Sequence, residues 1–276
     1  MSRIVACVAL VLLAALPAMA ATQGIASATV NGNSVSATVS LPVGLGADVT
    51  LSFENVTGLS LSSLGASAQL VNPTDPALLA RLPGGSVPTA FPVLLRIEPP
   101  AAGGLAFSGV ATLEVHTHNL QYAADCPLRI FSAHAGGPFQ DITSYMGAGS
   151  YRARSTTGGF SEFLIVSETR SVDQVITAKF DALEEVLDEY AGSMSTPLYD
   201  DLEERLEAAR DDYEQGSTAQ AIQELDGFLL VVQQQSGLGI PNVWRAARDV
   251  ANVAGYLRAG AMTLRFSLGL KGGLGL

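Results

Sequence analysis

Two histidines separated by one residue are the first candidates for chemistry. His116 and His118 end an alternating segment, so both side chains are expected on the same face of one strand. With His134, and with Asp141 nearby, they offer ligands that suit zinc or copper. The alternative is a polar strand end that only makes hydrogen bonds, because zinc sites usually need three or four ligands. His116, His118 and His134 are therefore the candidate metal ligands.

Cys126 is a second candidate, as a nucleophile with His118 or His134 as its base. It precedes Pro127 at the start of an apolar segment, where a cysteine is typical of a small buried hydrophobic residue. A reactive thiolate also needs a positive setting, whereas this chain has a formal net charge of −11. We expect Cys126 in a core, with a bridge between two chains left open.

Other catalytic and cofactor motifs are incomplete. The segment Gly58–Ser62 lacks the second glycine of a serine-hydrolase elbow, and Gly44–Gly46 lacks the rest of a dinucleotide fingerprint. Acidic pairs such as Glu184-Glu185 lack the glycine and the alternating oxygen ligands of a calcium loop. The sequence predicts no catalytic residues, no cofactor and no enzyme activity.

The start of the chain predicts export. Arg3, an apolar run and Ala18-Met19-Ala20 make residues 1–20 typical of a cleaved signal peptide. The apolar run is too short for a retained membrane anchor, so no transmembrane segment is expected after cleavage. The acidic balance argues against nucleic acid and anionic lipid as partners. We expect a protein of the periplasm, cell surface or extracellular space.

Residues 22–168 are predicted to form an antiparallel β-sandwich. Asn31-Gly32-Asn33 between two alternating segments is typical of a hairpin, and glycine- and proline-rich breakers recur between the later segments. Short strands at such spacing, without helical runs between them, favour a sandwich. The predicted strands cover residues 27–30, 35–41, 49–53, 67–71, 91–97, 109–116, 128–132, 150–154 and 160–166.

The hydrophobic period changes near Ser171, and residues 171–260 are predicted to form a four-helix bundle. Capping boxes are expected at Ser171 with Gln174 and at Ser217 with Gln220. The last helix is expected to begin near Pro241 and to run to about residue 258, with Trp244 as a core anchor. The predicted fold class is therefore α+β and multidomain, with a sandwich followed by a bundle.

The tail, residues 261–276, carries large apolar residues at every second position from Met262 to Leu270. This period favours a strand that pairs with the sandwich or with a partner. The alternative is continuation of the last helix to about Phe266, followed by a loose Lys271-Gly272-Gly273 end.

Two resemblances extend this interpretation. The run Ala221–Ile240, with the preceding LEERLEAARDDYEQG, resembles the FIMAH domain, an accessory helical module at the C-termini of secreted bacterial and archaeal proteins. Tyr151–Val166 is similar to the closing strand of bacterial cell-surface sandwiches related to ZU5. Some of those proteins cleave their own backbone at a Phe-Ser bond. Here Gly159 replaces the histidine of that motif, so self-cleavage is not expected.

These observations lead to two functional hypotheses. The first is an exported, non-catalytic interaction or structural protein whose partner is another envelope or extracellular protein or a polysaccharide. The second is a metal-binding protein or metal-dependent enzyme that uses His116 and His118 with a third ligand. The position of that third ligand separates the two hypotheses.

Overall fold

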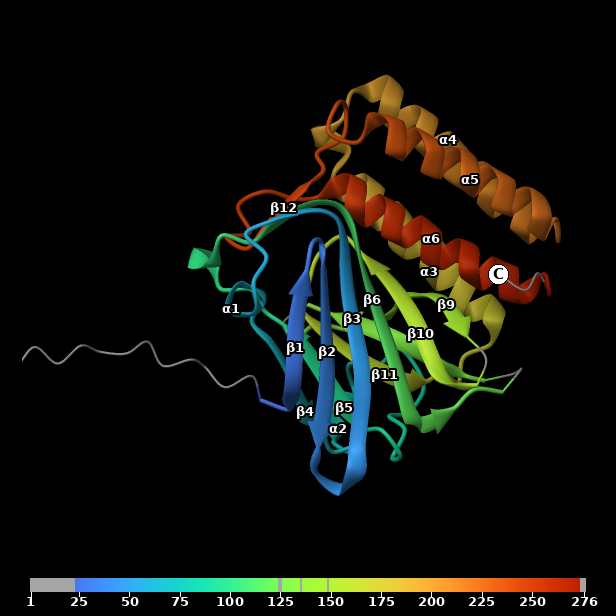
Figure 1. Cartoon of the computed structure of the whole chain (residues 1–276). Helices are drawn as coiled ribbons and strands as arrows, with labels where there is room; N and C mark the ends of the chain where they lie inside the picture. Colours follow the sequence, from blue (N-terminus) through green and yellow to red (C-terminus); the bar gives the residue numbers. More distant parts are fainter. Residues whose placement is uncertain (1–22, 124–125, 135, 148, 274–276) are drawn as a thin grey trace, which may run out of the picture.

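The chain forms an α+β structure with two antiparallel sheets and six α-helices among the residues described by the computed structural model, which are 23–123, 126–134, 136–147 and 149–273 (Figure 1). The predicted signal peptide lies outside these residues. The seven-stranded sheet has the order β1-β2-β3-β6-β10-β9, with β12 also paired to β6, and the five-stranded sheet has the order β4-β5-β11-β7-β8. The strands of the first sheet are β1 (Ile25–Asn31), β2 (Ser34–Leu41), β3 (Leu45–Thr57), β6 (Ala106–Gln121), β9 (Thr143–Gly147), β10 (Ser150–Thr157) and β12 (Val243–Arg245). Those of the second are β4 (Ala66–Leu70), β5 (Val93–Ile97), β7 (Leu128–Ala133), β8 (Gln140–Asp141) and β11 (Glu162–Ser167).

The alternation of β6 places one side of the first sheet in the core. Leu113 and Val115 are buried, while Glu114 and His116, which alternate with them, are only partly covered. The predicted hairpin is confirmed, since β1 pairs with β2 and Gly32 has a φ of 55°, which glycine adopts without steric cost. Residues of both sheets contribute to one hydrophobic core cluster, so the sheets face each other across it.

Trp244 is a core residue, but the prediction that it lies in a helix is wrong. It belongs to β12, and its ring centroid lies 5.3 Å from that of Phe107 and 5.2 Å from that of Phe160. Segment 236–252 contains glycine and proline breakers and returns to the first sheet, where only Trp244 of the three β12 residues is buried. Three residues are too few to show a strand period in the sequence.

Four long helices follow β11, with β12 between the third and the fourth, and they share a second hydrophobic core cluster. They are α3 (Val172–Glu189), α4 (Thr196–Glu214), α5 (Thr218–Gln235) and α6 (Val253–Lys271); the short α1 (Leu61–Leu64) and α2 (Pro76–Leu79) lie in connections of the sheet region. The capping box of Ser171 and Gln174 is confirmed. At α5 the helix does start after Ser217, but its side chain makes no capping hydrogen bond, so the second capping box is wrong.

The predicted tail strand is also wrong, because residues 253–271 form a single helix that also replaces the one expected from Pro241. The strand-like period arises because α6 is covered on two sides. Leu257, Leu264 and Leu268 enter the helical core cluster. The opposite side of α6 packs on β6, β9 and β10 of the first sheet. A helix buried on both sides does not show the single apolar stripe on which the helical period depends.

Helix α6 therefore connects the helices to the first sheet. In Figure 1, α6 and α3 lie next to the sheets, and α4 and α5 form an outer layer. Two hydrogen bonds of 2.7 Å join the Arg258 guanidinium to the Glu54 carboxylate on β3. The buried Asn252 amide donates to the carbonyl oxygens of Gly109 at 2.7 Å and Gly158 at 3.1 Å. None of the described helices is long and apolar enough to cross a membrane.

Candidate functional site

The structure brings two of the predicted metal ligands together. His116 and His118 lie on the same face of β6, with ring centroids 4.9 Å apart. His116 Nε2 lies 2.6 Å from Ser150 Oγ on β10. His134, in contrast, follows β7 of the second sheet. Within the described ranges, no group of three or more His, Cys, Asp or Glu side chains could hold a metal ion.

Cys126 lies in the core between the sheets, as expected for a small hydrophobic residue. It is only 7% exposed, and its Sγ lies 3.8 Å from the carbonyl oxygen of Gln121. A thiol in this position is poorly placed to attack an incoming substrate.

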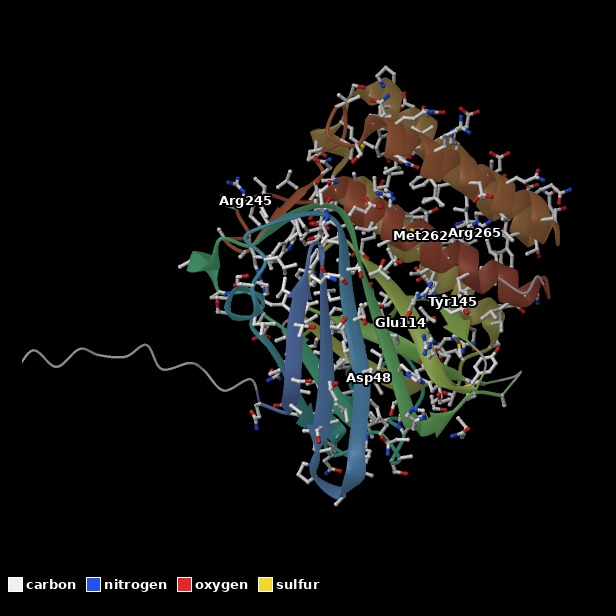
Figure 2. All side chains as sticks on the ribbon, in the orientation of Figure 1. Asp48, Glu114, Tyr145, Arg245, Met262 and Arg265 are labelled. Atoms are coloured by element: carbon white, nitrogen blue, oxygen red, sulfur yellow. The ribbon has the colours of Figure 1, made fainter. Side chains whose placement is uncertain are left out.

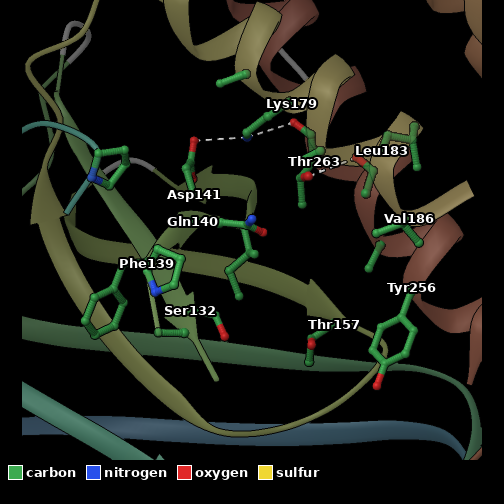
Figure 3. Close-up of a pocket in the computed structure, with 18 of the residues that line it drawn as sticks. Ser132, Phe139, Gln140, Asp141, Thr157, Lys179, Leu183, Val186, Tyr256 and Thr263 are labelled. Carbon is green, nitrogen blue, oxygen red and sulfur yellow. Dashed lines mark hydrogen bonds and ion pairs between the residues drawn. The ribbon is translucent and has the colours of Figure 1, made fainter. Parts of the chain in front are cut away.

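A hollow with a volume of about 510 Å³ lies between α3, α6 and the ends of β7, β8 and β10 (Figure 3). Small and branched apolar residues of α3 form one wall, with Ala178, Ala182 and Val186 among them. Hydrogen-bonding side chains such as Gln140 and Thr157 lie on the opposite side. We call this hollow the α3–α6 cavity.

A glycine at the boundary of this cavity allows α6 to lie close to the end of β10. Gly158 lies just after β10, and a Cβ built on it would stand 2.5 Å from the Tyr256 backbone nitrogen. Only glycine therefore allows α6 to approach the end of β10 this closely. The approach places Tyr256 at one side of the cavity, as Figure 3 shows.

A buried ion pair lies at the other end of the cavity. Lys179 Nζ of α3 lies 3.0 Å from Asp141 Oδ2 of β8, and the side chains are 9% and 2% exposed. The same ammonium donates to the Thr263 carbonyl oxygen at 3.1 Å and to Ser267 Oγ at 3.0 Å, both on α6. Asp141 Oδ1 accepts a 2.9 Å hydrogen bond from the Thr143 amide. The pair thus joins α3, α6 and the second sheet.

The partners of Asp141 outweigh the effect of burial on its carboxylate. Burial acts to raise the pKa of Asp141, but the Lys179 charge and the Thr143 hydrogen bonds together hold this pKa below its ordinary value. Burial lowers the pKa of Lys179, and the Asp141 charge opposes this effect. Each charge thereby neutralises the other, so the pair supplies the cavity with little net charge.

His134 and Tyr256, which also line the cavity, are neutral near pH 7. Burial, and secondarily the Arg248 charge, lower the pKa of His134 below its ordinary 6.5. Burial, followed by the charge of Glu189, raises the pKa of Tyr256. A neutral imidazole and a protonated phenol can donate and accept hydrogen bonds. The cavity therefore combines apolar walls and neutral polar groups with charged side chains that are paired, Lys179 with Asp141 and Arg170 with Glu168.

Comparison with protein-family models gives one match, to the family of unknown function DUF6689, over residues 8–271. The chain belongs to this family. The match to DUF6689 covers every residue that lines the α3–α6 cavity, and it spans the sheets and the helices together. Among curated proteins, no match to the chain is found.

In this DUF6689 member, the sequence pointed to Asp141 but not to its partner. The sequence places Asp141 near the candidate histidines, whereas its neighbour in the fold is Lys179. One signal was present, because Lys179 is the only basic residue of α3 and adjoins Phe180 of the apolar stripe. A long-range pair between residues 141 and 179 cannot be obtained from local spacing, since it depends on how α3 packs on β8.

Proposed function

We propose that this protein is an exported, non-catalytic binding protein of the bacterial envelope or extracellular space, and that the α3–α6 cavity is its ligand site. The sequence pattern of residues 1–20 supports export. We also infer that the two sheets form a β-sandwich and that the four long helices form a bundle packed against it. The shared core cluster within each part supports this description.

The observation that carries the proposal is the chemistry of the cavity. Its volume of about 510 Å³ falls within the roughly 300–1,000 Å³ usual for sites that bind small molecules. Apolar residues of α3 would hold the body of a ligand, and neutral groups such as His134 and Tyr256 would bond its polar end. The ligand class is a compact, mainly apolar molecule with one or two neutral hydrogen-bonding groups.

We favour binding over catalysis because the buried charged groups of the cavity, Lys179 and Asp141, form an ion pair with each other. Lys179 is engaged by Asp141 at 3.0 Å and by Thr263 and Ser267, so its nitrogen is not free to attack a ligand as a nucleophile. The metal hypothesis is the weaker alternative, since His116 and His118 supply two ligands where zinc sites use three or four protein ligands. The resemblances to FIMAH and ZU5-related modules agree with an accessory, non-enzymatic role.

The test uses the full chain without residues 1–20 and the neutral fluorescent probe N-phenyl-1-naphthylamine. We expect saturable fluorescence enhancement with one site per chain. Ala182→Phe should fill part of the cavity and weaken binding about tenfold or more. Ala208→Phe on α4 is the control, because Ala208 is also partly exposed but lies away from the cavity. Equal binding by the two variants, or no saturable binding, would refute the proposal.

A further inference from the structure

A second hollow lies on the other side of α6, between α5, α6 and the face of the first sheet that is turned away from the sheet core. Its volume is about 590 Å³. Arg154 and Tyr145 of the sheet line one side, and Arg265, Met262 and Gln233 of the helices line the other. Figure 2 shows Tyr145, Met262 and Arg265 on one face of the molecule, with Glu114 nearby. We call this hollow the arginine groove.

Positive charge exceeds negative charge on the sheet side of the groove. Glu114 is the shared partner of two arginines, with 3.2 Å to Arg152 Nη1 and 2.6 Å to Arg154 Nε. One carboxylate cannot neutralise two guanidinium groups. A local cationic excess therefore exists in a chain whose formal net charge is −11.

The terminal nitrogens of two guanidinium groups, those of Arg154 and Arg265, can donate hydrogen bonds to a further partner. Arg154 and Arg265 each use Nε for a carboxylate, Glu114 in one case and Asp226 in the other. Among the hydrogen bonds of the described residues, the Nη atoms of these two arginines make none. Both side chains are substantially exposed, at 49% and 34%. An exposed guanidinium whose Nη atoms make no hydrogen bond can bind a planar carboxylate.

The remaining groups of the groove suit a polyhydroxylated ring. Tyr145 is 37% exposed, and the carbon of the Arg154 guanidinium lies 5.0 Å from its ring centroid. An aromatic face of this kind can pack against the C–H groups of a sugar. Gln233, Ser144 and Thr112 line the same groove and supply donors and acceptors for hydroxyl groups.

From this combination we infer that the arginine groove binds an acidic polysaccharide, a chain of sugars that carry carboxylates. Arg154 and Arg265 would bind the carboxylates, and Tyr145 would support a sugar ring. The overall negative charge of the protein does not prevent this contact, because at physiological ionic strength charges are screened over about 8 Å. Apart from Thr156, which lines both hollows, the groove uses different residues from the proposed ligand cavity, and this inference stands independently of that cavity.

The test is isothermal titration of the full chain without residues 1–20 with an oligogalacturonate at low and physiological salt. We expect binding by the free-acid form and at least tenfold weaker binding by the same oligosaccharide with its carboxylates methyl-esterified. Arg154→Gln and Arg265→Gln should each weaken binding about tenfold.

Arg205→Gln on α4 is the matched control and should leave binding unchanged. Arg205 forms a 3.1 Å pair with Asp201 and is 35% exposed, close to the 34% of Arg265. Equal loss in this control would refute the groove, as would equal binding of the esterified oligosaccharide. If poly-glutamate binds as tightly as oligogalacturonate and responds to the same variants, the polysaccharide assignment is wrong and the groove is a general carboxylate site.

Discussion

Replacement of Lys179 by methionine tests whether the buried pair holds the helices to the second sheet. Methionine has a similar length and fills the same space, but it removes the ammonium that faces Asp141, Thr263 and Ser267. The Asp141 carboxylate, 2% exposed, would then be buried without a counter-charge. Removal of one member of a buried pair costs about 3–5 kcal/mol. We expect a loss of this size in the free energy of unfolding at pH 7.

The contribution of Asp141 to the free energy of unfolding should depend on pH with one sign in the wild type and with the opposite sign in the variant. In the wild type the pKa of Asp141 is lowered, so its contribution to stability is present above the ordinary value of 3.8 and is lost as the pH falls through the folded-state pKa. Without Lys179, burial raises this pKa in the folded state. The folded variant then binds a proton more readily than the unfolded chain. Its deficit should therefore shrink as the pH falls toward about 4.

Urea unfolding monitored by circular dichroism at several pH values measures both effects. The double variant Lys179→Met with Asp141→Asn is the control, since it removes both charges and keeps an oxygen for the Thr143 amide. It should be more stable at pH 7 than Lys179→Met alone. A loss below about 1 kcal/mol at pH 7, or a deficit that does not change with pH, would show that the pair does not support the fold in this way.

Three further predictions concern single positions. Leu225→Ala should destabilise the protein by about 2–5 kcal/mol in urea unfolding, because Leu225 is fully buried in the helical core cluster; a change near zero would contradict this packing. Since the pKa of His134 is lowered in the folded state, the wild type should lose thermal stability between about pH 7.5 and 5.5, and His134→Gln should lose less; parallel profiles would refute this cause. Asn252→Ala should cost about 2–4 kcal/mol because it removes the cap of α6 and leaves the Gly109 and Gly158 carbonyls without this donor; a loss within 0.5 kcal/mol, about the size of an ordinary surface effect, would mean that the connection is unimportant.

Local sequence patterns were sufficient to predict most of the helices and strands. The alternation around Leu113 predicted β6, and the serine at position 171 with its glutamine three residues later predicted the start of α3. Each signal depends on residues within one turn or one strand, so it can be recognised in the sequence without knowledge of the fold. The strands β8, β9 and β12 were missed, because two to five residues with few apolar side chains do not show a period.

The candidate sites depend on packing between distant elements, and the sequence alone could not supply it. The pattern predicted correctly that His116 and His118 share a face, since that follows from the strand repeat. It could not place His134, which follows β7 of the other sheet. The α3–α6 cavity exists only because α6 is a helix between the sheet and the helical core, and the sequence pattern for this segment favoured a strand.

The order in which the chain is made gives the position of α6 a consequence for biogenesis. The hydrogen bonds of Arg258 to Glu54 connect residues 204 positions apart. This contact between α6 and β3 can therefore form only after almost the whole chain has been synthesised. Hairpins such as β1–β2 can form early, but the outer face of the first sheet and the helical core cluster are completed together and last. A nascent chain cut or stalled before Asn252 would expose apolar surface from both regions to chaperones and proteases. Degradation would thus remove incomplete molecules as a whole and would not leave a stable N-terminal half.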